Sequence, residues 1–144
     1  MLNIIPIYPK IDPGSLTTDE KCSYCTNSTC CTYITQHIDG PRSMEDFDTL
    51  LWQVSHEQSQ LYKDKDGWFL LINNRCTHLQ DGGKCGIYSR RPQICREHSN
   101  EDCEFNDPVK SSDFDLFFKD YRSLDRYCRK RFKSWDNRFR KWNK

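Results

Sequence analysis

The sequence of 144 residues predicts a small α+β domain organised by a metal centre. Hydrophobic residues make up only 35% of the chain and charged residues 30%, so the aliphatic core is expected to be thin. Aromatic residues reach 13%, which argues against disorder. There are nine cysteines, and small domains with little core commonly rely on disulfides or metal ions. We therefore expect a single cysteine-rich domain over residues 1–144.

Residues 1–20 are expected to be extended, because Pro6, Pro9 and Pro13-Gly14 exclude a long helix. The chain does not open with a basic region followed by an apolar run, so no signal peptide is expected. No segment approaches the roughly 20 apolar residues of a membrane span. These features predict a cytoplasmic protein without membrane contact, in which thiols stay reduced. Together with the odd number of cysteines, they favour metal binding over a disulfide framework.

A short helix is predicted after Gly40-Pro41. Ser43 is expected to cap it, with Glu45 and Asp46 near its positive end. Its apolar residues recur at helical spacing and give it one buried face: Met44, Phe47, Leu51 and Val54.

A hairpin is predicted to follow this helix. Its first strand contains Leu61-Tyr62, and its second runs over residues 68–72. The turn between them covers residues 63–67, because Asp66-Gly67 is a strong turn signal.

The last element is predicted to be a long amphipathic helix over residues 112–142, packed on the rest of the domain. Ser112 is its expected cap, with Asp113 and Asp115 near the positive end. We expect Cys128 to be a core residue of this helix. Neither Pro nor Gly interrupts the apolar stripe, which recurs at steps of three or four residues: Phe114, Phe117, Tyr121, Leu124, Cys128, Phe132, Trp135, Phe139 and Trp142.

Charge is distributed unevenly along the chain. Residues 119–144 carry 11 basic and 3 acidic residues, a net charge of +8, while the remainder carries −7. The basic face has two interpretations: the solvated side of a helix docked on an acidic body, or a nucleic-acid-binding surface. We favour the first, because the aromatic residues all lie on one stripe. A homodimer through this end would cover any apolar residues that the body leaves exposed.

Eight cysteines between residues 22 and 103 are the candidate metal ligands. Cys22 and Cys25 have the spacing of a zinc knuckle. Cys30 and Cys31 are adjacent, and neighbouring side chains point apart in extended backbone, so this pair can serve two sites. Zinc is the favoured metal, and an iron–sulfur cluster is the alternative, since both take four thiolates. The candidate ligands are Cys22, Cys25, Cys30, Cys31, Cys76, Cys85, Cys95 and Cys103.

Other residues near the cysteines are candidates for supporting roles. Glycines crowd Cys85, where they allow the backbone to approach a metal–sulfur centre closely. Arg91 and Arg96 are expected either to offset the negative charge of the thiolates or to bind an anionic ligand. His78 and His98 flank the cysteines. Each is interpreted first as a solvated or hydrogen-bonded side chain and second as a ligand.

The order of these residues is specific. A cysteine knuckle precedes a Cys-Cys pair, and the run C-G-I-Y-S-R-R-P-Q-I-C-R follows over residues 85–96. This order resembles the YkgJ-type cysteine-cluster family, described as zinc- or iron-chelating. The chain departs from the family in having four residues, 26–29, between Cys25 and Cys30, where the family commonly has two. The residues that carry the resemblance are Cys22, Cys25, Cys30, Cys31, Cys76, Cys85, Ile87, Tyr88, Arg91, Pro92, Cys95, Arg96 and Cys103.

The resemblance implies a metal-chelating protein with a structural or regulatory role. Two alternatives stay open. A flagellin lysine methylase carries a similar cluster, which suggests an iron–sulfur redox or protein-modification enzyme. The sequence has no Gly-rich cofactor loop and singles out no nucleophile, so a protein that is not an enzyme is favoured. The other alternative is a zinc module that binds nucleic acid through the basic helix.

Overall fold

The computed structural model describes residues 17, 20, 22 and 25 and the ranges 28–98 and 110–141. The chain divides into two compact units, each of which is described by itself. The first comprises residues 1–30 and 77–109, and the second comprises residues 31–76 and 110–144. Strands and helices are both present, so the predicted α+β class is confirmed. A single domain over residues 1–144 stays a prediction.

None of the helices in the described ranges is long and apolar enough to span a membrane. The cytoplasmic location stays a prediction.

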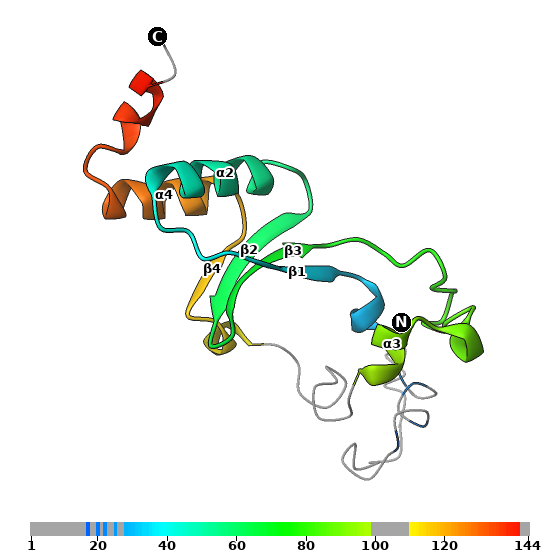
Figure 1. Ribbon diagram of the computed structural model, residues 1–144. Helices are drawn as coiled ribbons and strands as arrows, with labels where there is room; N and C mark the ends of the chain where they lie inside the picture. The colour runs from blue at the N-terminus through cyan, green and yellow to red at the C-terminus, as the bar shows by residue number, and fades with distance from the viewer. Residues whose placement is uncertain are drawn as a thin grey trace, which may run out of the picture. The chain divides into compact units, whose positions relative to one another are not determined.

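The second unit contains a four-stranded antiparallel sheet (Figure 1). Its strands are β1 (Ile34–Ile38), β2 (Ser59–Asp64), β3 (Gly67–Ile72) and β4 (Leu116–Phe118), in the order β1-β3-β2-β4. Strands β2 and β3 form the predicted hairpin, in which Asp64 pairs with Gly67 across a two-residue turn. Gly67 has φ +129°, which a residue with a side chain rarely adopts. Strands β1 and β4 were not predicted.

Two helices of this unit, α2 (Met44–Val54) and α4 (Tyr121–Arg131), lie side by side in Figure 1 and are in contact. The predicted cap of α2 is confirmed. The Ser43 side chain accepts a hydrogen bond from the Asp46 N–H at 3.2 Å, and the Asp46 carboxylate accepts one from the Ser43 N–H at 3.0 Å. This reciprocal pair satisfies two backbone donors and fixes where the helix begins.

The core lies between the sheet and these helices. Aromatic rings fill much of it: Phe47 meets Trp68 edge-on with centroids 6.0 Å apart, and Trp68 stacks on Phe118 at 6.4 Å. Large rings bury more apolar surface per residue than aliphatic side chains do, which compensates for the low aliphatic content. The buried cluster contains Phe47, Leu50, Leu51, Val54, Leu61, Trp68, Phe118, Leu124, Cys128 and Trp135.

The C-terminal helix is confirmed, but it is shorter than the predicted range of residues 112–142. Asp120, not Ser112, caps it, because the Asp120 carboxylate accepts a hydrogen bond from the Ser123 N–H at 2.9 Å. The three residues of β4 pair with β2 ahead of this cap. After Arg131 the chain turns extended at Phe132, which packs against Phe47, and then forms the 3-10 helix η5 (Trp135–Lys141). Trp142 lies outside the described residues.

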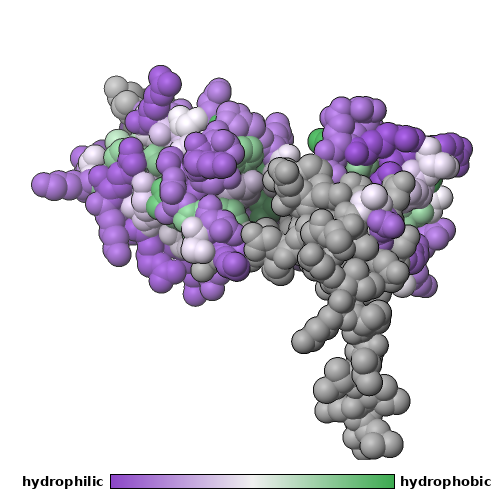
Figure 2. Space-filling view, turned by 90° about the horizontal axis from the view of Figure 1, so that it is seen from below, coloured by the Kyte–Doolittle hydropathy of each residue, from purple (hydrophilic) through white to green (hydrophobic). Residues whose placement is uncertain are grey.

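The apolar stripe is only partly buried. Leu124, Cys128 and Trp135 are in the core, but Phe117, Tyr121 and Phe139 are 42%, 44% and 45% exposed. Where residues are described, the face in Figure 2 is mostly hydrophilic with small apolar areas. The homodimer through this end stays a prediction.

Candidate metal centre

The candidate ligands are distributed over both units. Cys31 and Cys76 belong to the second unit, and Cys103 lies outside the described residues. Every cysteine that the structure describes is a free thiol, with no disulfide to compete for its sulfur. The boundary between the units falls between Cys30 and Cys31. The candidate ligands of the first unit that the structure describes are Cys22, Cys25, Cys30, Cys85 and Cys95.

The residue Ser28, three positions after Cys25, makes a backbone hydrogen bond to the sulfur of that cysteine. The N–H of Ser28 donates to Cys25 Sγ at 3.3 Å. Ser28 is 6% exposed and adopts a left-handed backbone conformation, with φ +44°, and its hydroxyl donates to the Gly83 carbonyl. A donor aimed at a ligand atom orients that ligand and supports its charge when a metal is bound. The four-residue spacer before Cys30 therefore supplies a residue that joins the knuckle to the glycine loop.

The glycine loop presents Cys85. Leu79 and Cys85 form an antiparallel bridge, and Gly82 and Gly83 turn the chain between them with φ +81° and +78°. The N–H of Gly86 donates to the His78 carbonyl at 2.8 Å, and a Cβ at Gly86 would lie 3.1 Å from that oxygen. Gly82 and Gly83 allow the left-handed turn, and the lack of a Cβ at Gly86 leaves room for the close backbone approach.

Cys31 and Cys76 are brought together by the sheet of the second unit. The N–H of Cys76 donates to the Cys31 carbonyl at 2.7 Å, beyond the pair Ile34–Ile72 that ends β1 and β3. A backbone hydrogen bond thus joins the two segments that flank the ends of β1 and β3 and carry the two cysteines. Sequence reasoning did not predict this pairing, because 44 residues and an unpredicted strand separate the two positions.

Arg91 and Arg96, in the run over residues 85–96, stabilise the turn between Cys85 and Cys95. Arg91 Nε donates to the Tyr88 carbonyl at 2.9 Å, and its guanidinium lies 3.7 Å over the Tyr88 ring. Arg96 Nε donates to the Arg91 carbonyl at 3.0 Å, and another of its nitrogens donates to the Ser89 carbonyl. These contacts fix the short helix α3 (Gln93–Glu97), which carries Cys95. Binding of an anion by Arg91 or Arg96 stays a prediction.

The two flanking histidines differ in their surroundings. His78 is exposed. His98 follows α3, and its Nε2 atom is buried with no hydrogen-bond partner in the described ranges.

Cys128 is a core residue of α4, as predicted. It is fully buried in α4 among core residues. Burial raises the pKa of its thiol to about 12, with a smaller contribution from the nearby Asp125 carboxylate. A thiol that resists ionisation this strongly is a poor metal ligand, because the thiolate is the form that binds metal.

The residues present fit zinc or iron in their chemistry. Free thiols, a backbone donor at Cys25 Sγ and an unpaired imidazole nitrogen in His98 are the groups expected around such an ion. No three His, Cys, Asp or Glu side chains in the described ranges lie close enough together to hold an ion. The ligand set therefore stays a prediction.

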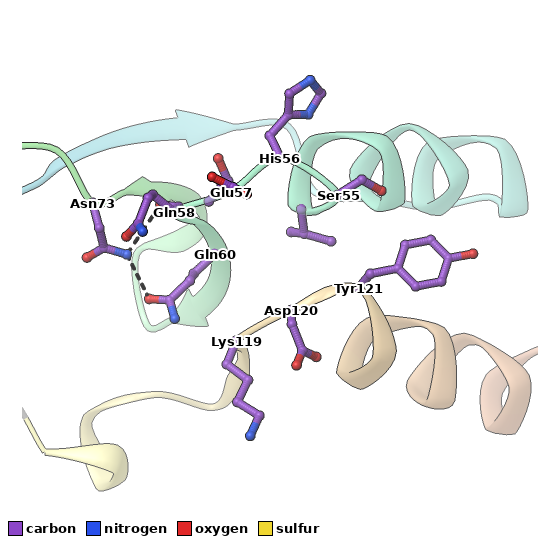
Figure 3. Close-up of a pocket in the computed structure, with 11 residues that line it drawn as sticks. Ser55, His56, Glu57, Gln58, Gln60, Asn73, Lys119, Asp120 and Tyr121 are labelled. Atoms are coloured by element: carbon purple, nitrogen blue, oxygen red, sulfur yellow. Dashed lines mark hydrogen bonds between the residues drawn. The ribbon is translucent and has the colours of Figure 1, made fainter.

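A separate pocket of about 380 Å³ lies in the second unit, between the end of α2, the start of β2 and residues 119–121 (Figure 3). Gln58, in a left-handed conformation with φ +65°, is held there by hydrogen bonds from Asn73 to its carbonyl oxygen. In Figure 3 His56 and Lys119 point away from each other, and the Asp120 carboxylate serves as a helix cap. The lining thus offers no convergent acid–base pair.

Comparison with protein-family models matches residues 21–129 to the CxxCxxCC family, which carries the description "Putative zinc- or iron-chelating domain". This is the YkgJ-type family that the cysteine order resembles. Comparisons with curated proteins and with solved structures gave no match.

Proposed function

The chain belongs to this zinc- or iron-chelating family, and on that premise we propose that it binds zinc through its cysteine cluster and uses the metal to organise its fold. The observation that carries the ligand assignment is the Ser28 N–H directed at Cys25 Sγ, with the Ser28 hydroxyl bound to Gly83. The proposed ligands are drawn from Cys22, Cys25, Cys30, Cys31, Cys76, Cys85, Cys95 and Cys103.

Zinc is preferred over an iron–sulfur cluster for a structural role. Thiolate-bound zinc has no redox chemistry of its own, and its binding contributes about 10 kcal/mol or more to the folding of small domains. The elements around the candidate ligands of the first unit are short: α3 has five residues and η3 (Tyr88–Arg90) has three. Such elements are not stable alone and need cross-links to persist.

The test is metal analysis of protein purified without oxygen, followed by chelation. We expect stoichiometric zinc, a colourless solution, and loss of cooperative unfolding when the zinc is removed. Cys95→Ala should lower the zinc content, while the matched variant Cys128→Ala should not. Protein that is brown and contains iron and inorganic sulfide would instead support the redox or protein-modification alternative. Protein that binds no metal would refute the proposal.

A second candidate is binding of an anionic polymer such as nucleic acid by α4. Arg122, Arg126 and Lys130 recur every four residues on this helix, and all three are exposed. None of them has an ion-pair partner in the part of the chain that the structure describes, whereas Arg129 pairs with Asp125 and Asp136. A row of exposed cations along one helix face matches the repeating charge of a phosphate backbone.

This candidate predicts salt-sensitive binding. The full protein should be retained on heparin and bind RNA, with an affinity that falls as salt rises. Replacing Arg122, Arg126 and Lys130 by Gln should abolish retention, while Arg129→Gln should have a smaller effect because its charge is already paired. Retention that does not change in the triple variant would rule this surface out.

A further inference from the structure

We infer that His98 is a metal ligand, so that the cluster combines thiolates with one imidazole nitrogen, donated by His98 Nε2. The inference rests on the proposed metal-binding function and deepens it.

The first argument is the state of the His98 side chain. Its Nε2 is buried and has no hydrogen-bond partner among the residues that the structure describes. Most buried polar atoms in proteins are hydrogen-bonded, and one left unpaired costs about 1–3 kcal/mol. An imidazole nitrogen can remove this cost by donating its lone pair to a metal ion.

The second argument is position. His98 comes three residues after Cys95, so the two residues repeat the spacing of the Cys22–Cys25 knuckle. The chain leaves α3 at His98, with φ −58° and ψ 107°. Arg96 fixes this helix through its two bonds to backbone carbonyls. His98 also belongs to the unit that contains six of the eight candidate cysteines.

The other three histidines of the chain provide a contrast. His37 and His78 are exposed. His56 is exposed as well, and its Nδ1 lies 2.9 Å from the Trp52 carbonyl. Among the four histidines, His98 is the one with a buried, unpartnered nitrogen. His78 is a matched control, since it lies in the same unit and beside a candidate cysteine.

An imidazole ligand also changes the charge of the site. Zinc held by four thiolates has a formal charge of about −2, and replacing one thiolate with neutral imidazole reduces it to about −1. The neighbouring cations then have less negative charge to offset. The contacts of Arg96 are consistent with this, because its Nε donates to the Arg91 carbonyl and another of its nitrogens donates to the Ser89 carbonyl.

The test uses the full-length protein loaded with Zn²⁺ alone. X-ray absorption of the wild type should show a nitrogen scatterer at about 2.0–2.1 Å beside sulfurs at about 2.3 Å. His98→Ala should lose the nitrogen signal and bind zinc at least tenfold more weakly. His98→Cys should recover affinity with sulfur in place of nitrogen, and His78→Ala should match the wild type.

The outcomes separate this inference from the proposed function. A wild type that binds no zinc refutes both. A wild type that binds zinc through sulfur alone, with His98→Ala indistinguishable from His78→Ala, overturns the role of His98 and leaves the proposed function standing. The wild-type spectrum decides the matter even if His98→Ala fails to fold.

Discussion

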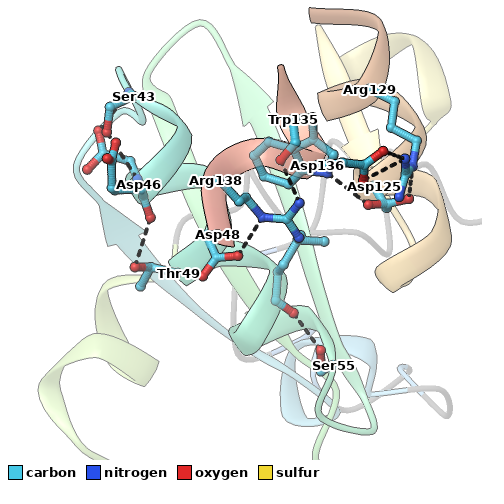
Figure 4. Close-up of polar contacts among 12 residues, drawn as sticks. Ser43, Asp46, Asp48, Thr49, Ser55, Asp125, Arg129, Trp135, Asp136 and Arg138 are labelled. Atoms are coloured by element: carbon cyan, nitrogen blue, oxygen red, sulfur yellow. Dashed lines mark hydrogen bonds and ion pairs between the residues drawn. The ribbon is translucent and has the colours of Figure 1, made fainter. Parts of the chain in front are cut away.

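Arg138 Nε donates a hydrogen bond to Asp48 Oδ1 at 2.8 Å and so links two residues 90 positions apart in the chain (Figure 4). The Arg138 side chain is only 5% exposed, and its guanidinium lies 3.8 Å over the Trp135 ring and 4.0 Å over the Phe139 ring. A second guanidinium nitrogen donates to the Trp135 carbonyl at 2.9 Å. This cation therefore connects η5 to α2, and at this point the basic C-terminal segment meets the acidic remainder of the chain in a partly buried contact.

Arg138→Ala should lower the free energy of unfolding by about 1.5 to 3 kcal/mol, as for loss of a hydrogen bond between charged groups. The cost arises because Asp48, 29% exposed, loses its partner and the two aromatic rings lose their stacked cation. Denaturant unfolding of the metal-loaded protein measures it. The control is Arg140→Ala, since Arg140 is exposed and has no ion-pair partner among the described residues. Equal stability of the two variants would contradict a fastening role for Arg138.

Cys128 should remain unreactive while the protein is folded. Because burial raises its pKa to about 12, a negligible fraction is ionised at pH 8, and only the thiolate is alkylated. Mass spectrometry after iodoacetamide treatment of the folded, zinc-loaded protein, or of the denatured protein, should place label on Cys128 only in the denatured sample. An unfolded thiol ionises near pH 8.5, so this residue stabilises the fold below that pH and loses its contribution as pH rises toward 12.

Cys128→Ala provides the corresponding stability measurement. We expect unchanged metal content and a cost of about 1 to 2 kcal/mol, as for removal of a small buried side chain. Cys128→Ser should cost more than the Ala variant, because it buries a hydroxyl among apolar neighbours. A loss of zinc in Cys128→Ala comparable to that in Cys95→Ala would show that the ninth cysteine is a ligand.

The parts of the fold that could be predicted are those with local signals. Ser43, with Glu45 and Asp46 in the turn after it, predicted the start of α2. Asp66-Gly67 predicted the hairpin turn. Strand β1 has no such signal, because four of its five residues are exposed and apolar and polar positions do not alternate. Strand β4 was predicted as helix, since Phe114, Phe117 and Tyr121 have helical spacing whether or not a strand interrupts them.

The candidate site shows the same limit. The candidate cysteines and the run over residues 85–96 could be identified from the spacing of residues in the sequence alone. The Ser28 contacts and the buried nitrogen of His98 could not, because both depend on which segments fold against the knuckle and α3. Burial of a single ring atom is a tertiary property, and no local pattern encodes it.

Gly83→Ala should weaken metal binding from outside the ligand set. Gly83 has φ +78°, where an L-residue with a Cβ costs about 1–2 kcal/mol, and its carbonyl accepts the hydrogen bond from Ser28. Movement of this loop would release the donor at Cys25 Sγ, so zinc affinity should fall roughly tenfold or more, as for loss of a supporting contact. Competition with a chromophoric chelator measures the affinity. Gly40→Ala is the control, because Gly40 lacks a positive φ and its Cβ would make an ordinary 3.4 Å contact with Trp68.

Two truncations should separate the contributions of the C-terminal elements. A chain ending at Asn106 lacks β4, α4 and η5, and so loses Phe118, Leu124, Cys128 and Trp135 from the core. It also exposes β2, which pairs with β4 in the intact sheet, and an uncovered edge promotes aggregation. We therefore expect insoluble or non-cooperative protein even with zinc present.

A chain ending at Ser134 keeps β4 and α4 but loses Trp135 and the Arg138 contact. It should stay soluble and bind zinc normally, because no candidate ligand is removed. Its free energy of unfolding should fall by at least about 3–5 kcal/mol, the cost of deleting a large buried aromatic side chain, because the Arg138 contact is lost as well. Circular dichroism during denaturant unfolding, with zinc content measured on the same samples, distinguishes the two chains. If the chain ending at Asn106 unfolded cooperatively with full zinc content, the C-terminal elements would not be needed for folding. Binding of an anionic partner by the basic face of α4 would then become the favoured interpretation of the C-terminal segment.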